Sequence, residues 1–146
     1  MNGLYRIVDR PLDLQEAIGA VSGPDRGAIA LFIGTTRDHQ GGRPVRFLEY
    51  QAYTAMAEDV MRAIGRDIAA LFGTPHLAIL HRVGRLEVGE ASVVIAVASA
   101  HRREALAACA HAIDRLKQDA PIWKKEHYAD GAAWIEGPGA HPSPDP

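Results

Sequence analysis

Several features that would assign this sequence to a familiar class of protein are missing. It has one cysteine, Cys109, so an intramolecular disulfide is impossible and we expect a cytoplasmic protein. No apolar run approaches the ~20 residues that a membrane span needs. The first ten residues lack the apolar core of a secretory signal. The net charge of −2 argues against broad nucleic-acid binding, which requires a basic face.

Patterns typical of resident cofactors are also missing. No spacing of Cys, His and carboxylate residues indicates a metal site, and Gly41-Gly42 is not part of a nucleotide-binding phosphate loop. We therefore expect neither a metal nor a cofactor. Cys109 falls on the apolar stripe of a predicted helix, and nothing beside it in the sequence would depress its pKa. It is expected to be a core residue.

What is present suits one globular domain. The chain has 146 residues, of which 47% are hydrophobic and 23% charged, which is enough apolar surface for a sizeable core. The last ten residues are rich in glycine and proline and have little to bury. We predict one domain over residues 1–136 and a flexible tail over residues 137–146.

The hydrophobic pattern predicts an α+β domain with a mainly antiparallel sheet and two long helices. Strands are expected at residues 4–8, 27–35, 45–53, 76–83 and 91–100, the second of them buried, with short strands after residue 121. Helices are expected over residues 14–21, 54–72 and 102–117. Residues 38–44 are expected to form a flexible loop and residues 84–89 a turn.

Two helix details can be predicted from residue type. Asp13 and Thr54 are expected to cap the first two helices, and Gly73-Thr74-Pro75 to end the second. The apolar stripes of the two long helices are predicted to be Met56, Val60, Ile64, Ile68 and Leu71, and Leu106, Cys109, Ile113 and Leu116.

Two lysines flank the end of the last long helix. Lys117 lies in its final turn, Pro121 stops the helix, and Lys124 follows Trp123 on a predicted strand. The helix break and the Trp123 anchor are expected to turn the two lysines toward one another. Two ammonium groups held together bind anions, and one of them could titrate low enough to move protons. The alternative is two unrelated surface lysines.

Basic residues also mark the start of that helix and the end of an earlier strand. His101 and Arg102 lie at a helix N-terminus, whose free N–H groups attract anions; the alternative is a pair of solvated basic residues. Arg37 follows Thr35 and Thr36 at a strand end, where it could hold an anion or simply be solvated. His81, at another strand end, is expected to be structural and is left outside the site.

The length of the helix separates these groups. Arg102 and Lys117 are 15 positions apart, or roughly 22 Å along a helix. A small ligand cannot easily contact both in one chain. Either they serve different sites, or two chains build a composite pocket. We hypothesise a homodimer in which His101 and Arg102 reach the lysine pocket of the partner chain.

Taken in order, several short motifs resemble one family. They are Gly34-Thr35-Thr36-Arg37-Asp38-His39, His81-Arg82-Val83-Gly84 with Gly89-Glu90, Ser99-Ala100-His101-Arg102, and Leu116-Lys117 followed by Ala120-Pro121-Ile122-Trp123-Lys124-Lys125-Glu126. Over about residues 4–136 the chain resembles the large, catalytic subunit of molybdopterin synthase, the MoaE family. Each motif alone is weak, but the ordered set is specific.

The resemblance implies an α/β hammerhead fold and a homodimer that carries a small ubiquitin-like sulfur-carrier subunit at each end, a heterotetramer. The carrier would insert its C-terminal Gly-Gly thiocarboxylate into a pocket of this chain. The implied reaction is a step of molybdenum cofactor biosynthesis. This sulfurtransferase would convert cyclic pyranopterin monophosphate to molybdopterin by installing two sulfurs as a dithiolene.

The resemblance also implies roles for individual residues. Lys117 and Lys124 correspond to the functional lysines of the family, and Arg37, His101 and Arg102 to its anion-binding groups. Thr35, Thr36, Lys125 and Glu126 match substrate-contacting positions. Lys125 stands where some relatives have Arg, which keeps the charge but loses the bidentate fork. We hypothesise that Lys117 faces the carrier and that Lys124 acts on the substrate as acid or base.

Two other functions compete with this interpretation. The same Arg, His and Lys cluster could serve a non-catalytic anion- or nucleotide-binding module. Alternatively, a hydrolase could use Cys109 as its nucleophile. A dithiolene product would exclude the binding module, and loss of activity on alkylation of Cys109 without unfolding would favour the hydrolase.

Overall fold

The computed structural model describes residues 3–74 and 76–135, so the tail predicted for residues 137–146 lies outside the described residues. In chain order the elements are β1 (Gly3–Val8), α1 (Leu14–Val21), β2 (Ala28–Thr35), β3 (His39–Gln40), β4 (Arg43–Ala52), α2 (Thr54–Phe72), β5 (His76–Arg82), β6 (Gly84–Glu87), β7 (Ala91–Ser99), α3 (Arg102–Asp119), β8 (Ile122–Tyr128) and β9 (Gly131–Ile135).

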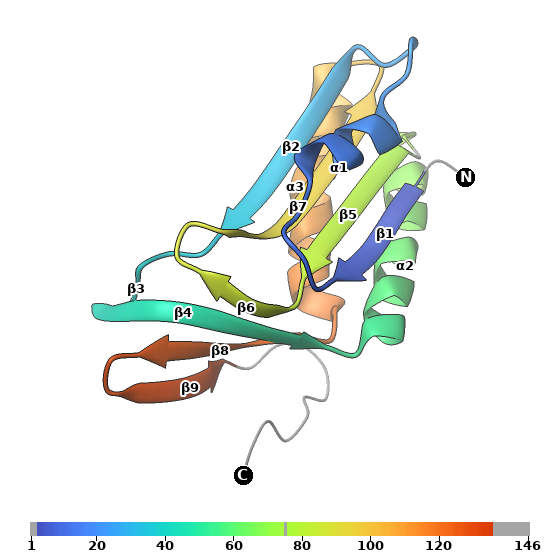
Figure 1. Cartoon of the computed structure of the whole chain (residues 1–146). Helices are drawn as coiled ribbons and strands as arrows, with labels where there is room; N and C mark the ends of the chain where they lie inside the picture. The colour runs from blue at the N-terminus through green and yellow to red at the C-terminus, as the bar shows by residue number, and fades with distance from the viewer. Residues whose placement is uncertain (1–2, 75, 136–146) are drawn as a thin grey trace.

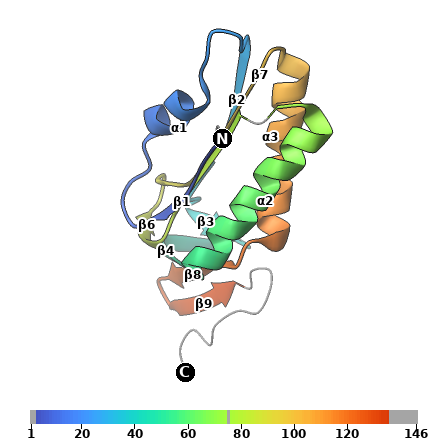
Figure 2. The same cartoon turned by 90° about the vertical axis from the view of Figure 1, so that its right-hand side faces the viewer.

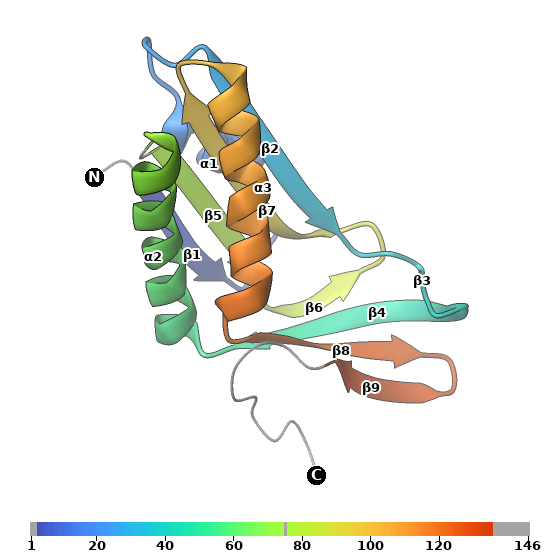
Figure 3. The ribbon, with the colours of Figure 1, turned by 180° about the vertical axis from the view of Figure 1, so that it is seen from behind.

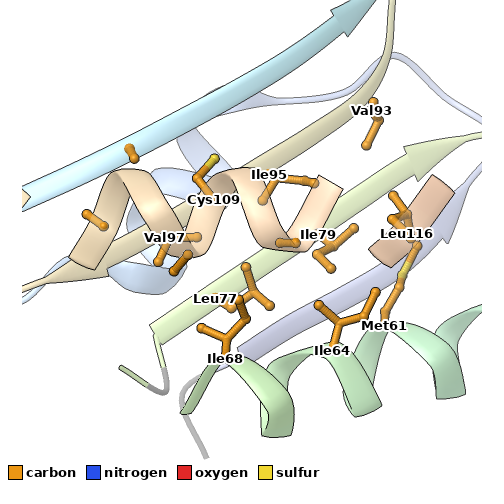
Figure 4. Close-up of a cluster of buried hydrophobic side chains, with 14 of the residues drawn as sticks. Met61, Ile64, Ile68, Leu77, Ile79, Val93, Ile95, Val97, Cys109 and Leu116 are labelled. Carbon is orange, nitrogen blue, oxygen red and sulfur yellow. The ribbon is translucent and has the colours of Figure 1, made fainter. Parts of the chain in front are cut away.

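The first sheet carries the main core. Its strand order is β1-β5-β7-β2, and only the β1–β5 pair is parallel. Helices α2 and α3 cover one face and α1 covers the other, as Figure 2 shows with the sheet seen near its edge. Leu77 and Ile79 of β5 meet Ile64 and Ile68 of α2 between the sheet and the helices (Figure 4). Burial of these apolar side chains is the main stabilising term for such a layer.

The second sheet lies crosswise at one end of the first (Figure 1). Strand β4 pairs with β8, and β8 pairs with β9, while β3 and β6 both pair with β4. Seen from behind in Figure 3, the C-terminal end of α3 points onto this sheet and the chain turns directly into β8. The predicted α+β class, with a mainly antiparallel sheet and two long helices in a hammerhead arrangement, is confirmed.

Strand β2 is not the buried strand that its apolar run predicts. It lies at the edge of the first sheet, where β7 is its one partner strand among the described residues. Ala30 faces the core, but the alternating Ile29, Leu31 and Ile33 remain 41%, 43% and 40% exposed. These three side chains lie on the sheet face that carries α1, whose packing is against β1, β5 and β7. An apolar run cannot reveal that one of its faces is left uncovered.

The segment at residues 38–44 is an ordered hairpin, not the flexible loop that was expected. Gly41 and Gly42 have φ values of 57° and 81°, which suit a two-residue turn between β3 and β4. Likewise, residues 84–87 form strand β6, where only a turn was predicted.

The helix boundaries were predicted well and the caps less so. Asp13 caps α1 by accepting a hydrogen bond from the Gln15 N–H at 2.9 Å. For α2 the cap position is Tyr53, and Thr54 is already helical, so the predicted Thr54 cap is wrong. Helix α3 continues to Asp119, two residues beyond the prediction.

The predicted stripes were partly wrong because three of their outer members are solvent-exposed. Met56, Leu71 and Leu106 are 56%, 59% and 62% exposed. The side chains buried from α2 include Ala57 and Met61 instead, so the true stripe is displaced by about one position.

Candidate active site

The candidate site is built where α3 ends and β8 begins. The chain leaves the helix after Ala120, whose N–H donates to the Leu116 carbonyl at 3.0 Å. The Pro121 carbonyl accepts from the Tyr53 N–H at 3.1 Å, which ties the turn to the start of α2. Trp123 is 2% exposed and packs edge-on against Tyr53. This anchor fixes the first residues of β8, and strand alternation then places Lys124 on the opposite face from Trp123.

Lys117 and Lys124 line the same cavity, as their spacing predicted. The cavity has a volume of about 150 Å³ and lies between the ends of α3 and β5, the start of β7 and the face of β4 and β8. Its polar lining consists of both lysines with Tyr50, His81 and Ser92. Apolar side chains, among them Ile113, Leu116, Ile122 and Ile135, form the rest of the wall. The arrangement is a small cavity with two cations and an apolar floor.

A second hollow adjoins this cavity and extends toward β2. It has a volume of about 430 Å³ and shares Tyr50, Ser92 and both lysines with the cavity. It adds several polar groups to the lining, namely Thr35, Arg37, His39, Gln40 and Glu126. The two volumes together provide a continuous surface with Lys117 and Lys124 at their junction.

The two lysines have different electrostatic surroundings. Lys124 Nζ lies 3.7 Å from Glu126 Oε2, and the Glu126 side chain is 3% exposed. Glu126 also accepts a hydrogen bond from the Tyr128 hydroxyl. Lys117 keeps an exposed side chain in the single chain, yet its pKa is lowered, first by desolvation and second by the charge of Lys124. A lysine with a lowered pKa exchanges protons more readily at neutral pH.

Three predicted residues at the end of β2 contribute in different ways. Arg37 is exposed at the rim of the hollow and donates to the Gln40 side-chain oxygen at 2.6 Å. Thr36 is buried, and its backbone N–H donates to the Glu90 carbonyl while its carbonyl accepts from the Gly89 N–H. Thr36 therefore fixes the loop between β2 and β3 instead of lining the hollow, whereas Thr35 lines it.

Three predicted site residues lie away from the cavity. His101 and Arg102 are exposed at the opposite end of α3, roughly 22 Å from Lys117 along the helix axis. Lys125 lies on the other face of β8, where its Nζ is 5.4 Å from the centre of the Trp134 ring. The structure thus brings together Lys117, Lys124, Glu126, Thr35 and Arg37, but not His101, Arg102 or Lys125.

His81, which was expected to be a structural residue outside the site, lies in the wall of the cavity. Its side chain is 6% exposed and lines the cavity beside Lys117. Burial lowers the pKa of His81 to about 4, the Arg82 carbonyl opposes this, and the Lys117 charge adds to it. Alternation along β5 could have indicated its direction, because His81 follows Leu77 and Ile79 on the face that packs against α2 and α3.

Tyr50 and Ser92 were also missed. Tyr50 packs edge-on against the His81 ring, with centroids 5.0 Å apart. The pKa of Tyr50 is raised, mainly by burial, while a hydrogen bond with Ser92 opposes that shift. Nothing at sequence level distinguishes these two residues from other strand residues, because their role depends on β4 crossing the end of β5 and β7.

Cys109 is a core residue, as predicted. It is 6% exposed among apolar side chains (Figure 4). Burial raises the pKa of its thiol to about 11, so the thiolate is scarce at neutral pH. This environment disfavours a hydrolase that uses Cys109 as nucleophile.

Residues 3–74 and 76–135 contain neither a membrane-spanning helix nor a cluster of metal-binding side chains. No helix in these ranges is long and apolar enough to cross a membrane. No group of three or more His, Cys, Asp or Glu side chains in the same ranges is arranged to hold a metal ion.

Comparison with known proteins gives a consistent result. A family model described as MoaE protein matches residues 7–119. The molybdopterin synthase catalytic subunit of Halalkalibacterium halodurans is 42% identical over 131 residues, which cover 90% of this chain and 84% of the relative. The crystal structure of molybdopterin synthase from Staphylococcus aureus matches with a TM-score of 0.87 and 37% identity, covering 90% of this chain and 96% of that chain.

A more distant structure is similar in fold. It is described as a protein–protein complex of subunits 1 and 2 of molybdopterin-converting factor from Helicobacter pylori. The match has a TM-score of 0.74 at 23% identity and covers 94% of this chain and 92% of that chain.

Proposed function

Because the chain belongs to the MoaE protein family, we propose that it is the catalytic subunit of a molybdopterin synthase. In this role it converts cyclic pyranopterin monophosphate to molybdopterin, a step of molybdenum cofactor biosynthesis. The sulfur comes from the C-terminal thiocarboxylate of a small ubiquitin-like carrier subunit. The observation that carries the proposal is the convergence of Lys117 and Lys124, from two different elements, on one cavity.

The lysine pair suits the charges of this reaction. The substrate carries a cyclic phosphate, and the carrier arrives with an anionic thiocarboxylate. Two ammonium groups and Arg37 at the rim provide positive charge along a continuous surface of two adjoining hollows. Anions held in such a partly desolvated site interact more strongly with these groups than they would in water.

The surroundings of each lysine support a division of roles. Lys124 is held by the buried Glu126 carboxylate, which fixes its position beside the substrate. We assign to Lys124 the acid–base step when the cyclic phosphate opens. Lys117 is exposed at the cavity mouth and has a lowered pKa. We assign to it the carrier-facing role, in which it attracts the thiocarboxylate and stabilises the oxyanion when the resulting thioester is hydrolysed.

A separate sulfur carrier accounts for the absence of a thiol from the lining of the cavity and of the adjoining hollow. Cys109 is buried in the core, and its thiol has a raised pKa. The sulfur must then enter on another molecule. The H. pylori structure, which is of a two-subunit complex, supports the idea that a fold of this kind works with a second subunit.

The position of His101 and Arg102 is explained by a homodimer. Strand β2 starts beside this pair, since Ala28 is in register with Ser99 and a Cβ on Gly27 would lie 2.6 Å from the Ala100 carbonyl oxygen. Its other end, at Thr35, reaches the hollow. A two-fold axis near Leu31 would place the start of one β2 beside the end of the partner's β2. His101 and Arg102 would then reach the partner's cavity.

The exposed apolar stripe of β2 supports this dimer. Ile29, Leu31 and Ile33 present a row of uncovered apolar side chains on one sheet face. A second copy that packs its own β2 there would bury the row. Leu31→Glu, in the middle of the row, is expected to convert the dimer to a monomer in sedimentation and to abolish most of the activity. An unchanged dimer would contradict this arrangement.

The proposed reaction can be tested with purified components. The chain is incubated with a thiocarboxylated carrier and the cyclic pterin, and the dithiolene product is detected after conversion to a fluorescent derivative. Product formation is expected, whereas an anion- or nucleotide-binding module would bind the pterin and yield no dithiolene. Alkylation of Cys109 in the folded protein is expected to be slow and to leave the reaction unaffected, since the thiol takes no part in it.

A further inference from the structure

His81 is a cavity residue to which neither the resemblance nor the comparisons assign a role. It ends the row Leu77, Ile79, His81 on the face of β5 that packs against α2 and α3. Its ring lies at the cavity wall with Lys117 and Tyr50. An imidazole at the end of an otherwise apolar row needs polar partners, because a buried polar group without a hydrogen bond is costly.

One of those partners fixes the tautomer of the ring. His81 Nδ1 lies 2.8 Å from the carbonyl oxygen of Arg82. A carbonyl oxygen only accepts, so Nδ1 carries the hydrogen and donates it. The neutral ring then has a lone pair on Nε2, at the edge of the ring farthest from the backbone. The neutral form is also the one that burial and the charge of Lys117 favour.

Lys117 is the group in the cavity that lacks a fixed acceptor. Lys124 has Glu126 as its ion-pair partner. For Lys117, no ion pair with a carboxylate forms within residues 3–74 and 76–135. Its ammonium donates up to three hydrogen bonds, and its charge lowers the pKa of His81 as the smallest of three causes, after burial and the opposing Arg82 carbonyl.

We propose that His81 is a positioning residue for Lys117. The two side chains line one cavity but share no hydrogen bond in this structure. The bare Nε2 is the acceptor toward which the exposed Lys117 ammonium can turn, and that bond would hold the nitrogen at the cavity wall. Because the imidazole stays neutral, it orients the lysine without adding a third positive charge to the cavity. The kinetic part of this inference rests on the proposed function, but the positioning itself does not.

The first test uses the unmodified protein. Two-bond ¹H–¹⁵N correlation spectra of the imidazole distinguish the two neutral tautomers and the cation. His81 is expected to be neutral with its hydrogen on Nδ1 between pH 6 and pH 8. A hydrogen on Nε2, or a protonated ring in this range, would overturn the proposal whatever reaction the chain catalyses.

The second test separates the two hydrogen bonds of the ring with matched variants. In His81→Gln the longer side chain places an amide oxygen near the position of Nε2, so the acceptor for Lys117 is retained. In His81→Asn the shorter amide retains a donor to the Arg82 carbonyl but does not reach the lysine. Both variants are checked for folding by circular dichroism and thermal unfolding. A purely structural role for His81 would make them equally defective.

The readout for positioning is the rate at which Lys117 is acylated by an amine-specific reagent, measured by peptide mass spectrometry as a function of pH. Loss of the acceptor destabilises the ammonium form. His81→Asn should therefore label Lys117 about three- to tenfold faster at pH 8, with a profile displaced to lower pH. His81→Gln should match the wild type, and Lys124 should label equally in all three proteins. Equal Lys117 profiles in the two variants would overturn the proposal.

The pH profile is interpretable because the other groups near Lys117 are unchanged in these variants. Those that line the cavity or the adjoining hollow are Tyr50 on β4, Lys124 and Glu126 on β8, and Arg37 and His39 beyond β2. Each contributes equally to the wild type and to both variants, so a difference between the profiles reports the acceptor at residue 81.

The third readout is the steady-state reaction of the chain assembled with its carrier. His81→Asn is expected to lower kcat about 10- to 100-fold while KM for the pterin changes little, because a misplaced ammonium acts in the transition state. His81→Gln is expected to retain most of kcat. If no reaction occurs even with the wild type, the proposed function fails, while the labelling and NMR results still decide the role of His81.

Discussion

The two ends of helix α3 carry cations in contrasting surroundings. At the C-terminal end, Lys117 agrees with the helix dipole and faces a cavity formed with β4, β5 and β8. At the N-terminal end, the positive charge of Arg102 opposes the dipole. His101 occupies the cap position without a side-chain capping bond. Both of these residues are exposed in the single chain.

The contrast shows which part of the site one chain can complete. The cations at the C-terminal end are held by the fold itself, through the turn at Pro121 and the Glu126 partner of Lys124. The cations at the N-terminal end reduce the stability of their own helix and line neither of the two hollows. This loss of helix stability is understandable if His101 and Arg102 act only in the dimer, where they lie beside the cavity of the partner chain.

The largest expected loss of activity comes from substitutions at the C-terminal end of α3, where the lysines line the cavity. Lys117→Ala and Lys124→Ala are each expected to lower kcat for dithiolene formation by about 100- to 1000-fold, because each removes a charge that stabilises the transition state. The variant Arg62→Ala, which removes an exposed cation of α2 paired with Asp59, provides the control. Full sulfur-transfer rates in both lysine variants would refute their assignment.

The same two variants should differ in stability. Lys124→Ala leaves the nearly buried Glu126 carboxylate without its ion-pair partner, so its Tm should fall. Lys117→Ala removes a charge that has no such partner within the described ranges, and its Tm should hold or rise. Thermal unfolding of the two proteins in one buffer measures this difference.

The next largest loss of activity is expected at the N-terminal end of α3. Arg102→Ala is expected to lower activity about 10- to 100-fold, since a charge-assisted hydrogen bond to the anion is lost. Mixing this variant with Lys117→Ala and allowing subunits to exchange should restore about a quarter of wild-type activity. Half of the dimers formed at random are mixed, and one of the two composite sites in each mixed dimer is intact. A site contained within one chain would stay inactive in every mixture.

The sequence predicted the cavity lysines because their positions depend on local signals. Pro121 ends the helix and Trp123 anchors the strand. Alternation in β8 then turns Lys124 to the face opposite Trp123. Alternation in β5 gives the direction of His81, but its meeting with Tyr50 and Ser92 could not be predicted, since the three residues come together only where β4 crosses the end of the first sheet. The exposed face of β2 was missed for a related reason: its apolar residues are typical of a buried strand, and only the packing of α1 shows that their face is uncovered.

A smaller effect tests whether the N-terminal end of α3 would be more stable without the residues proposed to bind the substrate. His101→Asp places a good capping residue at the N-terminus of α3 and adds an anion there. Both changes favour the helix, so the free energy of unfolding should rise by about 1 kcal/mol. Activity should fall at the same time. Urea unfolding with an unchanged m-value measures the gain, and a loss of stability would show that His101 has a structural role in the fold.

The smallest effect is a pH-dependent change in Tm when Lys117, at the C-terminal end of α3, is replaced. The pKa of Lys117 is lowered from its ordinary value of 10.5, so folding disfavours its protonated form. That cost is full below the folded pKa and disappears as the pH rises to the ordinary value. Lys117→Met should therefore raise Tm slightly at pH 7, and the gain should shrink toward pH 10.5. Gln118→Met, on the exposed surface of the same helix turn, controls for the added methionine, and its effect should not vary with pH. A Tm for Lys117→Met that falls at pH 7 would mean that the ammonium stabilises the fold, in which case the lysine would be a structural residue of the cavity.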